Sequence, residues 1–221
     1  MEPVAPPLNP SIAALRRFAR PRDPRLERCE LCSTTLTEEH SHLLELATRQ
    51  IVCACEACSC LFDGRKDGRY RRVSRRVWYL PGLEISAGQW DALLIPINMA
   101  FFFRSTLQDR MMTFYPSPAG AVESLLAPDA WAEIVENNPV LNRLEPDVEA
   151  LLVNRIGSAQ GLSPAEYYLA PIDDCYRLVG LIRTHWKGLS GGTELWEEIG
   201  RFFAGLKGRA EIVRGESPCL N

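Results

Sequence analysis

Apolar runs separated by short polar segments recur in the chain beyond about residue 98. The phenylalanine-rich residues 98–105 predict a buried strand. Residues 111–115 should pair with it, because the intervening segment 106–110 is short enough for a hairpin. Further apolar runs at residues 148–154 and 167–170 predict two more strands. Together these segments indicate an antiparallel sheet.

Segments with helical spacing lie between and after these strands. Asp173 can cap a helix over residues 173–186, and a last helix is expected over residues 194–207. Shorter helices are expected at residues 87–94 and 129–136, and another should begin near Pro118, where the prolines of the preceding segment break a strand. The last helix carries an apolar stripe typical of packing on a sheet, formed by Leu195, Ile199, Phe202, Phe203 and Leu206.

The N-terminal part of the chain has a different pattern. Short extended runs at residues 43–46 and 50–53 flank a turn, and basic extended runs at residues 69–73 and 76–80 can add edges to them. Before these lies a proline-rich segment with one short helix-capable run. With 221 residues, the chain can form one sizeable core and one small module. We expect a proline-rich arm (1–24), a Cys-rich zinc-ribbon-like module (25–82), an α+β domain (83–210) and a tail (211–221).

Five of the eight cysteines fall within the thirty residues 29–58 of this small module, and their spacing is that of a metal site. Cys29 and Cys32 form one CxxC pair, and Cys55 and Cys58 form another. Two residues between thiolates let one tight turn direct both sulfur atoms at the same ion, and two such turns on facing hairpins supply a tetrahedral Zn²⁺ site. We therefore predict that these four cysteines are the metal ligands.

Three further residues compete for the same site. If residues 53–55 are extended, Cys53 and Cys55 point to the same face. With Cys55 as the ligand, Cys53 is a buried small residue behind the metal, and it is a ligand itself if Cys55 faces away. His40 and His42 lie between the two pairs, and either could replace a cysteine. Cys60 is expected to pack rather than to bind.

The metal itself has alternatives. Zinc suits a ribbon with intervening strands, but four or five thiolates could also hold iron or an iron-sulfur cluster, as in a rubredoxin-like or cluster-containing electron carrier. A redox CxxC motif usually opens a helix after a strand, and neither pair is expected in that setting. The predicted fold class is α+β, a small zinc-ribbon-like module followed by an antiparallel sheet packed with helices.

No credible catalytic set stands out elsewhere, so no catalytic or cofactor-binding residue is assigned. Cys175 and His185 lie ten residues apart on one predicted helix, about 15 Å along its axis, which excludes a direct dyad. Cys175 is better explained as a small buried residue. Asp173 and Asp174 are explained by the start of the helix. The chain therefore does not favour an enzyme.

Charge and hydropathy limit the partners and the compartment that we expect for this protein. The net charge is −3, but residues 65–76 hold seven basic residues and one acidic residue. A solvated face balanced by an acidic body explains this stretch better than a nucleic-acid surface. No apolar run is long enough to span a bilayer, and the first ten residues do not resemble a secretory signal, so we expect a cytoplasmic protein without a membrane span.

The chain resembles an uncharacterised bacterial family over nearly its whole length after the arm. The motifs that carry the resemblance include both CxxC pairs, His42-Leu-Leu, and segments 100–105, 114–120 and 171–183. Members of that family look like accessory proteins encoded beside oxygen-tolerant uptake [NiFe]-hydrogenases. The resemblance implies a protein partner, a hydrogenase subunit or maturation factor. The leading hypothesis is therefore a non-enzymatic metal-binding accessory protein. The alternatives are an iron-sulfur or rubredoxin-like electron carrier and a nucleic-acid-binding zinc ribbon.

Overall fold

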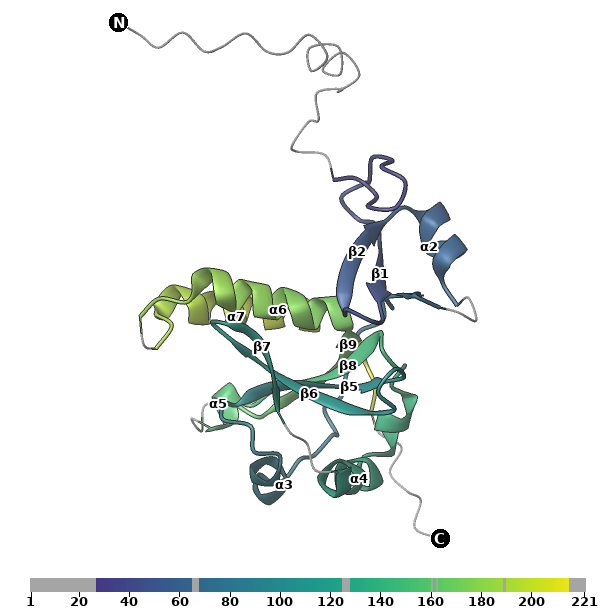
Figure 1. Ribbon diagram of the computed structural model, residues 1–221. Helices are drawn as coiled ribbons and strands as arrows, with labels where there is room; N and C mark the ends of the chain where they lie inside the picture. Colours follow the sequence, from purple (N-terminus) through teal and green to yellow (C-terminus); the bar gives the residue numbers. More distant parts are fainter. Residues whose placement is uncertain are drawn as a thin grey trace, which may run out of the picture.

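The computed structural model describes residues 27–64, 68–124, 128–159, 161, 163–188 and 190–214. The predicted proline-rich arm and its short helix-capable run lie outside these residues. Two sheets are present in the described part of the chain, one small and one large (Figure 1).

The larger sheet forms the body of the protein. Its neighbouring strands are antiparallel, except for the two short strands at one edge, which are parallel. Within the described residues it has seven strands, in the spatial order β10 (Glu211–Ile212), β4 (Trp78–Tyr79), β9 (Glu166–Pro171), β8 (Glu149–Asn154), β5 (Met99–Ser105), β6 (Arg110–Ser117) and β7 (Gly120–Ser124).

Helices cover both faces of this sheet (Figure 1). One face carries α6 (Ile172–His185) and α7 (Thr193–Gly208), and the other carries α3 (Ala87–Ala92) and α4 (Pro128–Asn137). A short 3₁₀ helix, η1 (Pro139–Arg143), follows α4, and the single turn α5 (Ile156–Ala159) follows β8.

Alternate residues of the central strands supply the two halves of the core. Phe101 and Leu152 pack in the cluster under α6 and α7, whereas Phe102 and Leu151 pack in the cluster with α3 and α4. All four side chains are fully buried. Because the sheet is covered on both faces, its central strands are continuously apolar instead of alternating, which is why β5 contains three consecutive phenylalanines.

The smaller sheet stands over the end of α6 where that helix begins (Figure 1). It has the order β2 (Gln50–Ala54), β1 (Ser41–Glu45) and β3 (Tyr70–Arg72), and α2 (Glu56–Phe62) follows β2. One face carries a small cluster with Leu43 and Val52, and the other contributes Leu44 to the main core. The two faces of β1 therefore pack in two different hydrophobic clusters.

Arginines from the stretch after β2 also tie the small sheet to the larger one. Arg76 donates from Nε and Nη2 to the two carboxylate oxygens of Glu149, at 2.9 and 2.6 Å. Arg71 forms an ion pair with Glu145 at 3.0 Å. Arg69 and Arg72 pair with acidic residues of the small module, Glu45 and Glu56. Four of the five arginines in the described residues 69–76 thus have an acidic partner within the protein.

The predicted fold class is confirmed, with two local corrections. The helix expected near Pro118 is absent, because β6 continues through Pro116 and turns at Gly120 (φ +122°) into β7. Proline is tolerated there because β6 has passed its last paired position with β5 and has a partner strand on one side. The extended run predicted at residues 76–80 joins the larger sheet, as β4 beside β9, instead of edging the small module.

Candidate metal centre

Cys29 and Cys32 lie on a tight turn that begins the described part of the chain. The Ser33 N–H donates to the Cys29 carbonyl at 2.7 Å, and the Cys29 N–H donates to the Thr34 carbonyl at 2.8 Å. Ser33 adopts a left-handed conformation, with φ +63°, which reverses the chain directly after the second cysteine. This turn directs both thiols to the same side.

Cys55 and Cys58 are placed by the start of a helix. Cys55 is the N-cap of α2, and its sulfur accepts a hydrogen bond from the Cys58 N–H at 3.4 Å. The expectation of a second hairpin turn is therefore wrong, and so is the premise that neither pair opens a helix after a strand. The N-cap geometry explains the spacing, because an N-cap side chain and the third helical residue lie close together.

The structure brings the four cysteine sulfurs together. All four lie within 4.8 Å of one another, and Cys32 Sγ is 3.7 Å from Cys55 Sγ. Zinc–sulfur bonds of about 2.3 Å at tetrahedral angles would place two sulfurs about 3.8 Å apart. A disulfide requires about 2.05 Å, and these cysteines are free. The spacing of this pair is thus that of two ligands of one ion.

The pKa values of Cys29, Cys32 and Cys58 are shifted in different directions. Hydrogen bonds with the hydroxyl and the backbone of Thr34 lower the pKa of Cys32 to about 6. Burial, together with hydrogen bonds to the neighbouring cysteines, raises the pKa of Cys58 to about 12. Burial raises the pKa of Cys29, but backbone hydrogen bonds outweigh it and the net shift is downward. A divalent cation would supply the charge that lets all four ionise.

The three alternate ligands form a separate group. His40, His42 and Cys53 each place a ligand atom within 4.8 Å of the others, apart from the four cysteines. Cys53 and Cys55 therefore do not share one site, because the chain leaves the strand at Ala54 and turns into α2. The signal for this group was present in the hairpin itself, since His42 lies directly opposite Cys53.

Asp173 has a role that the sequence did not reveal. It lies in the first turn of α6, whose N-cap is Pro171 with no side-chain capping bond, so the predicted Asp173 cap is wrong. Instead, its carboxylate is 2.6 Å from His42 Nδ1. This contact raises the pKa of His42 above its ordinary value, against the opposing effect of burial.

The remaining cysteine candidates lie outside both groups. Cys175 is fully buried in the main core, and burial raises the pKa of its thiol well above the ordinary value. His185 lies at the far end of α6 near Glu194, so the predicted absence of a dyad agrees with the helix. Cys60 is exposed and contacts Glu56 at 3.6 Å.

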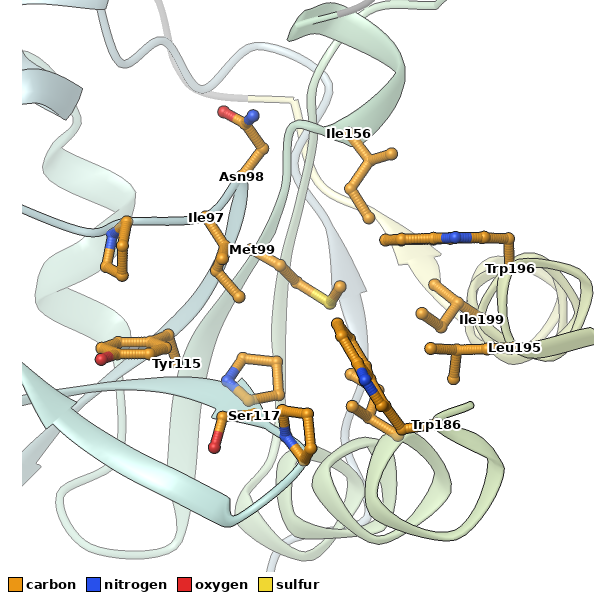
Figure 2. A pocket seen from close by; sticks show the side chains of 14 residues that line it. Ile97, Asn98, Met99, Tyr115, Ser117, Ile156, Trp186, Leu195, Trp196 and Ile199 are labelled. Atoms are coloured by element: carbon orange, nitrogen blue, oxygen red, sulfur yellow. The ribbon is translucent and has the colours of Figure 1, made fainter. Parts of the chain in front are cut away.

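A pocket of about 370 Å³ lies between β5, β6 and the helices α6 and α7 (Figure 2). Trp186, Trp196 and Met99 point into it. Both indole N–H groups donate to backbone carbonyls, of Gly188 and Ser190. Among the described residues of its lining, no carboxylate, imidazole, thiol or amine occurs, and the phenol of Tyr115 is the single titratable side chain.

The comparisons with known proteins assign the chain to a family over most of the described fold and name no activity. A family model described as a family of unknown function (DUF5947) matches residues 28–210. No curated protein matches the chain, and no solved structure matches it. Within the described residues, no helix is both long enough and apolar enough to cross a bilayer.

Proposed function

The chain belongs to DUF5947, a family of unknown function, and we propose from its site that it is a non-enzymatic zinc-binding accessory protein. The observation that carries this proposal is the convergence of four cysteine sulfurs within 4.8 Å. A zinc site with four protein ligands is closed and structural, whereas catalytic zinc keeps an open position. The ligands are Cys29, Cys32, Cys55 and Cys58, as expected from their spacing.

The zinc would order a module that is too small to hold itself together. The cluster around the four cysteines contains only six buried residues among those described. Binding one ion joins the turn at Cys29 to the helix start at Cys55, which precede and follow the β1–β2 hairpin in the chain. The ordered module then presents its outer surface to a protein partner.

Iron is the competing metal. In a [4Fe–4S] cluster each thiolate binds a different iron, and in a [2Fe–2S] cluster two thiolates bind each iron, so thiolates on different irons lie further apart than those on a single ion. The spacing of all four sulfurs within 4.8 Å therefore favours one ion over a cluster. A single iron would fit the same four thiolates, so elemental analysis must separate zinc from iron.

The test compares two serine variants of the untagged protein. Cys32→Ser removes a proposed ligand, and Cys60→Ser is the matched control, because Cys60 is an exposed cysteine outside both groups. We expect colourless wild-type protein containing zinc, the same metal content in C60S, and loss of one zinc per chain in C32S. A brown protein with iron and sulfide, or equal zinc in wild type and C32S, would overturn the proposal.

The partner we propose is a hydrogenase subunit or maturation factor, which rests on the sequence resemblance alone. Four arginines of residues 69–76 form ion pairs with carboxylates of this chain, which supports a protein partner over a nucleic acid because these four charges are already compensated. Affinity purification from the native host, with C32S as the comparison, tests this. A purification that enriches no hydrogenase component would contradict the assignment.

A further inference from the structure

His40, His42 and Cys53 converge on the face of the β1–β2 hairpin opposite to Leu43 and Val52, and Cys53 also packs against the cluster that contains Cys29 and Cys58. His42 and Cys53 are directly opposite each other in the β1–β2 ladder, and His40 lies two residues before His42. Residues two apart on an extended chain, and residues opposite each other in a ladder, share a face. The neighbouring pair on that face is Leu44 and Ile51, which packs against the main core.

His40 has an unused ligand atom pointing into this group. Its side chain is only 8% exposed, and its Nε2 is buried with no hydrogen-bond partner among the described residues. The other ring nitrogen, Nδ1, lies 3.0 Å from the Thr37 carbonyl and 3.5 Å from a carboxylate oxygen of Glu27. A buried imidazole nitrogen without a partner is costly unless something binds it.

His42 is held in the orientation of a metal ligand. Its Nδ1 contacts the Asp173 carboxylate at 2.6 Å, which leaves Nε2 for the group shared with His40 and Cys53. Metal-binding histidines commonly donate their second ring N–H to a carboxylate or a carbonyl, which fixes the tautomer and the ring direction. Both histidines here have such a partner on Nδ1.

A cavity of about 430 Å³ opens beside the two imidazoles, between the small sheet and the start of α6. Its lining includes both histidines together with Asp173 and Arg75. Cys53 is not part of that lining, whereas both histidines are. A ligand could therefore approach the histidines from the cavity.

We propose that His40, His42 and Cys53 form a second zinc site, bound through the two Nε2 atoms and the Cys53 sulfur. Its fourth position is filled by water or by an exchangeable ligand from the cavity. Three protein ligands with an open position distinguish it from the closed four-cysteine site. Asp173, which arrives from α6, is a positioning residue, so metal at this site also joins the small sheet to the main domain.

The first test is zinc stoichiometry of the full chain, titrated with Zn²⁺ against a competing chelator. Wild type and the Cys60→Ser control should bind two zinc ions per chain, and Cys53→Ser should bind one. Cys32→Ser should lose only the other ion, so failure of the four-cysteine site and failure of this site give different results. A single zinc per chain in wild type, with no change in C53S, would overturn the second site.

The second test separates a positioning role from a structural one. Asp173→Asn keeps the shape of the side chain but removes the carboxylate that orients His42. It should keep two zinc ions per chain and weaken the affinity of one of them about 10- to 100-fold. Unchanged affinity at both sites would contradict the role of Asp173. Melting curves with and without zinc show whether either variant remains folded, and the wild-type stoichiometry decides the proposal if one does not.

Discussion

The sulfur atoms of Cys32 and Cys55 lie 3.7 Å apart, although the two residues are separated by 23 positions in the sequence. One sulfur comes from a tight turn and the other from the N-cap of a helix. The chain between them, residues 33–54, contains the hairpin of β1 and β2. A shared metal ion, as proposed above, would explain why two such different elements direct their thiols at one point.

Removing the metal should loosen the small sheet before the large one. We expect chelation to abolish most hydrogen-exchange protection in β1 and β2, because their cysteine cluster contains few buried residues and metal binding stabilises such modules directly. The amides of β5 and β8 should stay protected, since those strands are covered on both faces. Hydrogen exchange measured by mass spectrometry with and without chelator checks this. Equal loss in both sheets would contradict a local role for the metal.

The cysteines should differ in reactivity once the metal is removed. Cys32 is exposed and has a pKa of about 6, so its alkylation rate should rise with pH through a midpoint near that value. The sign follows from the chemistry, because the thiolate is the reactive form and accumulates above the pKa. Cys175 should stay unmodified in the folded protein, since it is buried and its pKa is raised.

Peptide mapping after brief treatment with iodoacetamide distinguishes these sites. Loading with zinc should protect Cys32 across the same pH range, and acidification should reverse that protection because protons compete with the metal for thiolates. Rapid labelling of Cys32 in zinc-loaded protein would show that it is not a ligand.

The ion pair of Arg76 and Glu149 should matter for stability. The Glu149 side chain is only 1% exposed, so Arg76→Ala would leave a buried carboxylate without its partner. We expect the free energy of unfolding to fall by about 3–5 kcal/mol. Arg104→Ala is the control, because Arg104 and Asp109 form an exposed pair whose loss should cost less than about 1 kcal/mol. Urea unfolding of both variants compares the two, and similar losses would contradict this account.

Local sequence patterns were sufficient to predict the elements that have long apolar runs or clear turn residues at their ends. The β5–β6 hairpin, the strands β8 and β9, and the stripe of α7 follow from apolar runs and helical spacing. The strand β7 did not, because the prolines before Gly120 are typical of a broken strand and are tolerated only where a neighbouring strand is missing. The extended run that contains β4 was predicted, but its pairing with β9 was not, and the two-residue strand β10 is too short to have a pattern of its own.

The candidate site could be predicted in part for the same reason. The spacing of the cysteines predicted which four sulfurs converge. Two intervening residues bring the thiols of a pair together both in a tight turn and at a helix N-cap. The contact of His42 with Asp173 spans 131 positions and depends on how the small sheet packs on α6, so no local pattern could indicate it. The separation of Cys53 from Cys55 depends on where β2 ends and α2 begins.

X-ray absorption at the zinc edge of the Cys53→Ser variant tests the central claim most directly, because that variant keeps only the four-cysteine site. The account predicts a single shell of four sulfur neighbours at about 2.3 Å. A shell dominated by nitrogen or oxygen neighbours, or a protein that carries iron with a neighbouring iron, would contradict it.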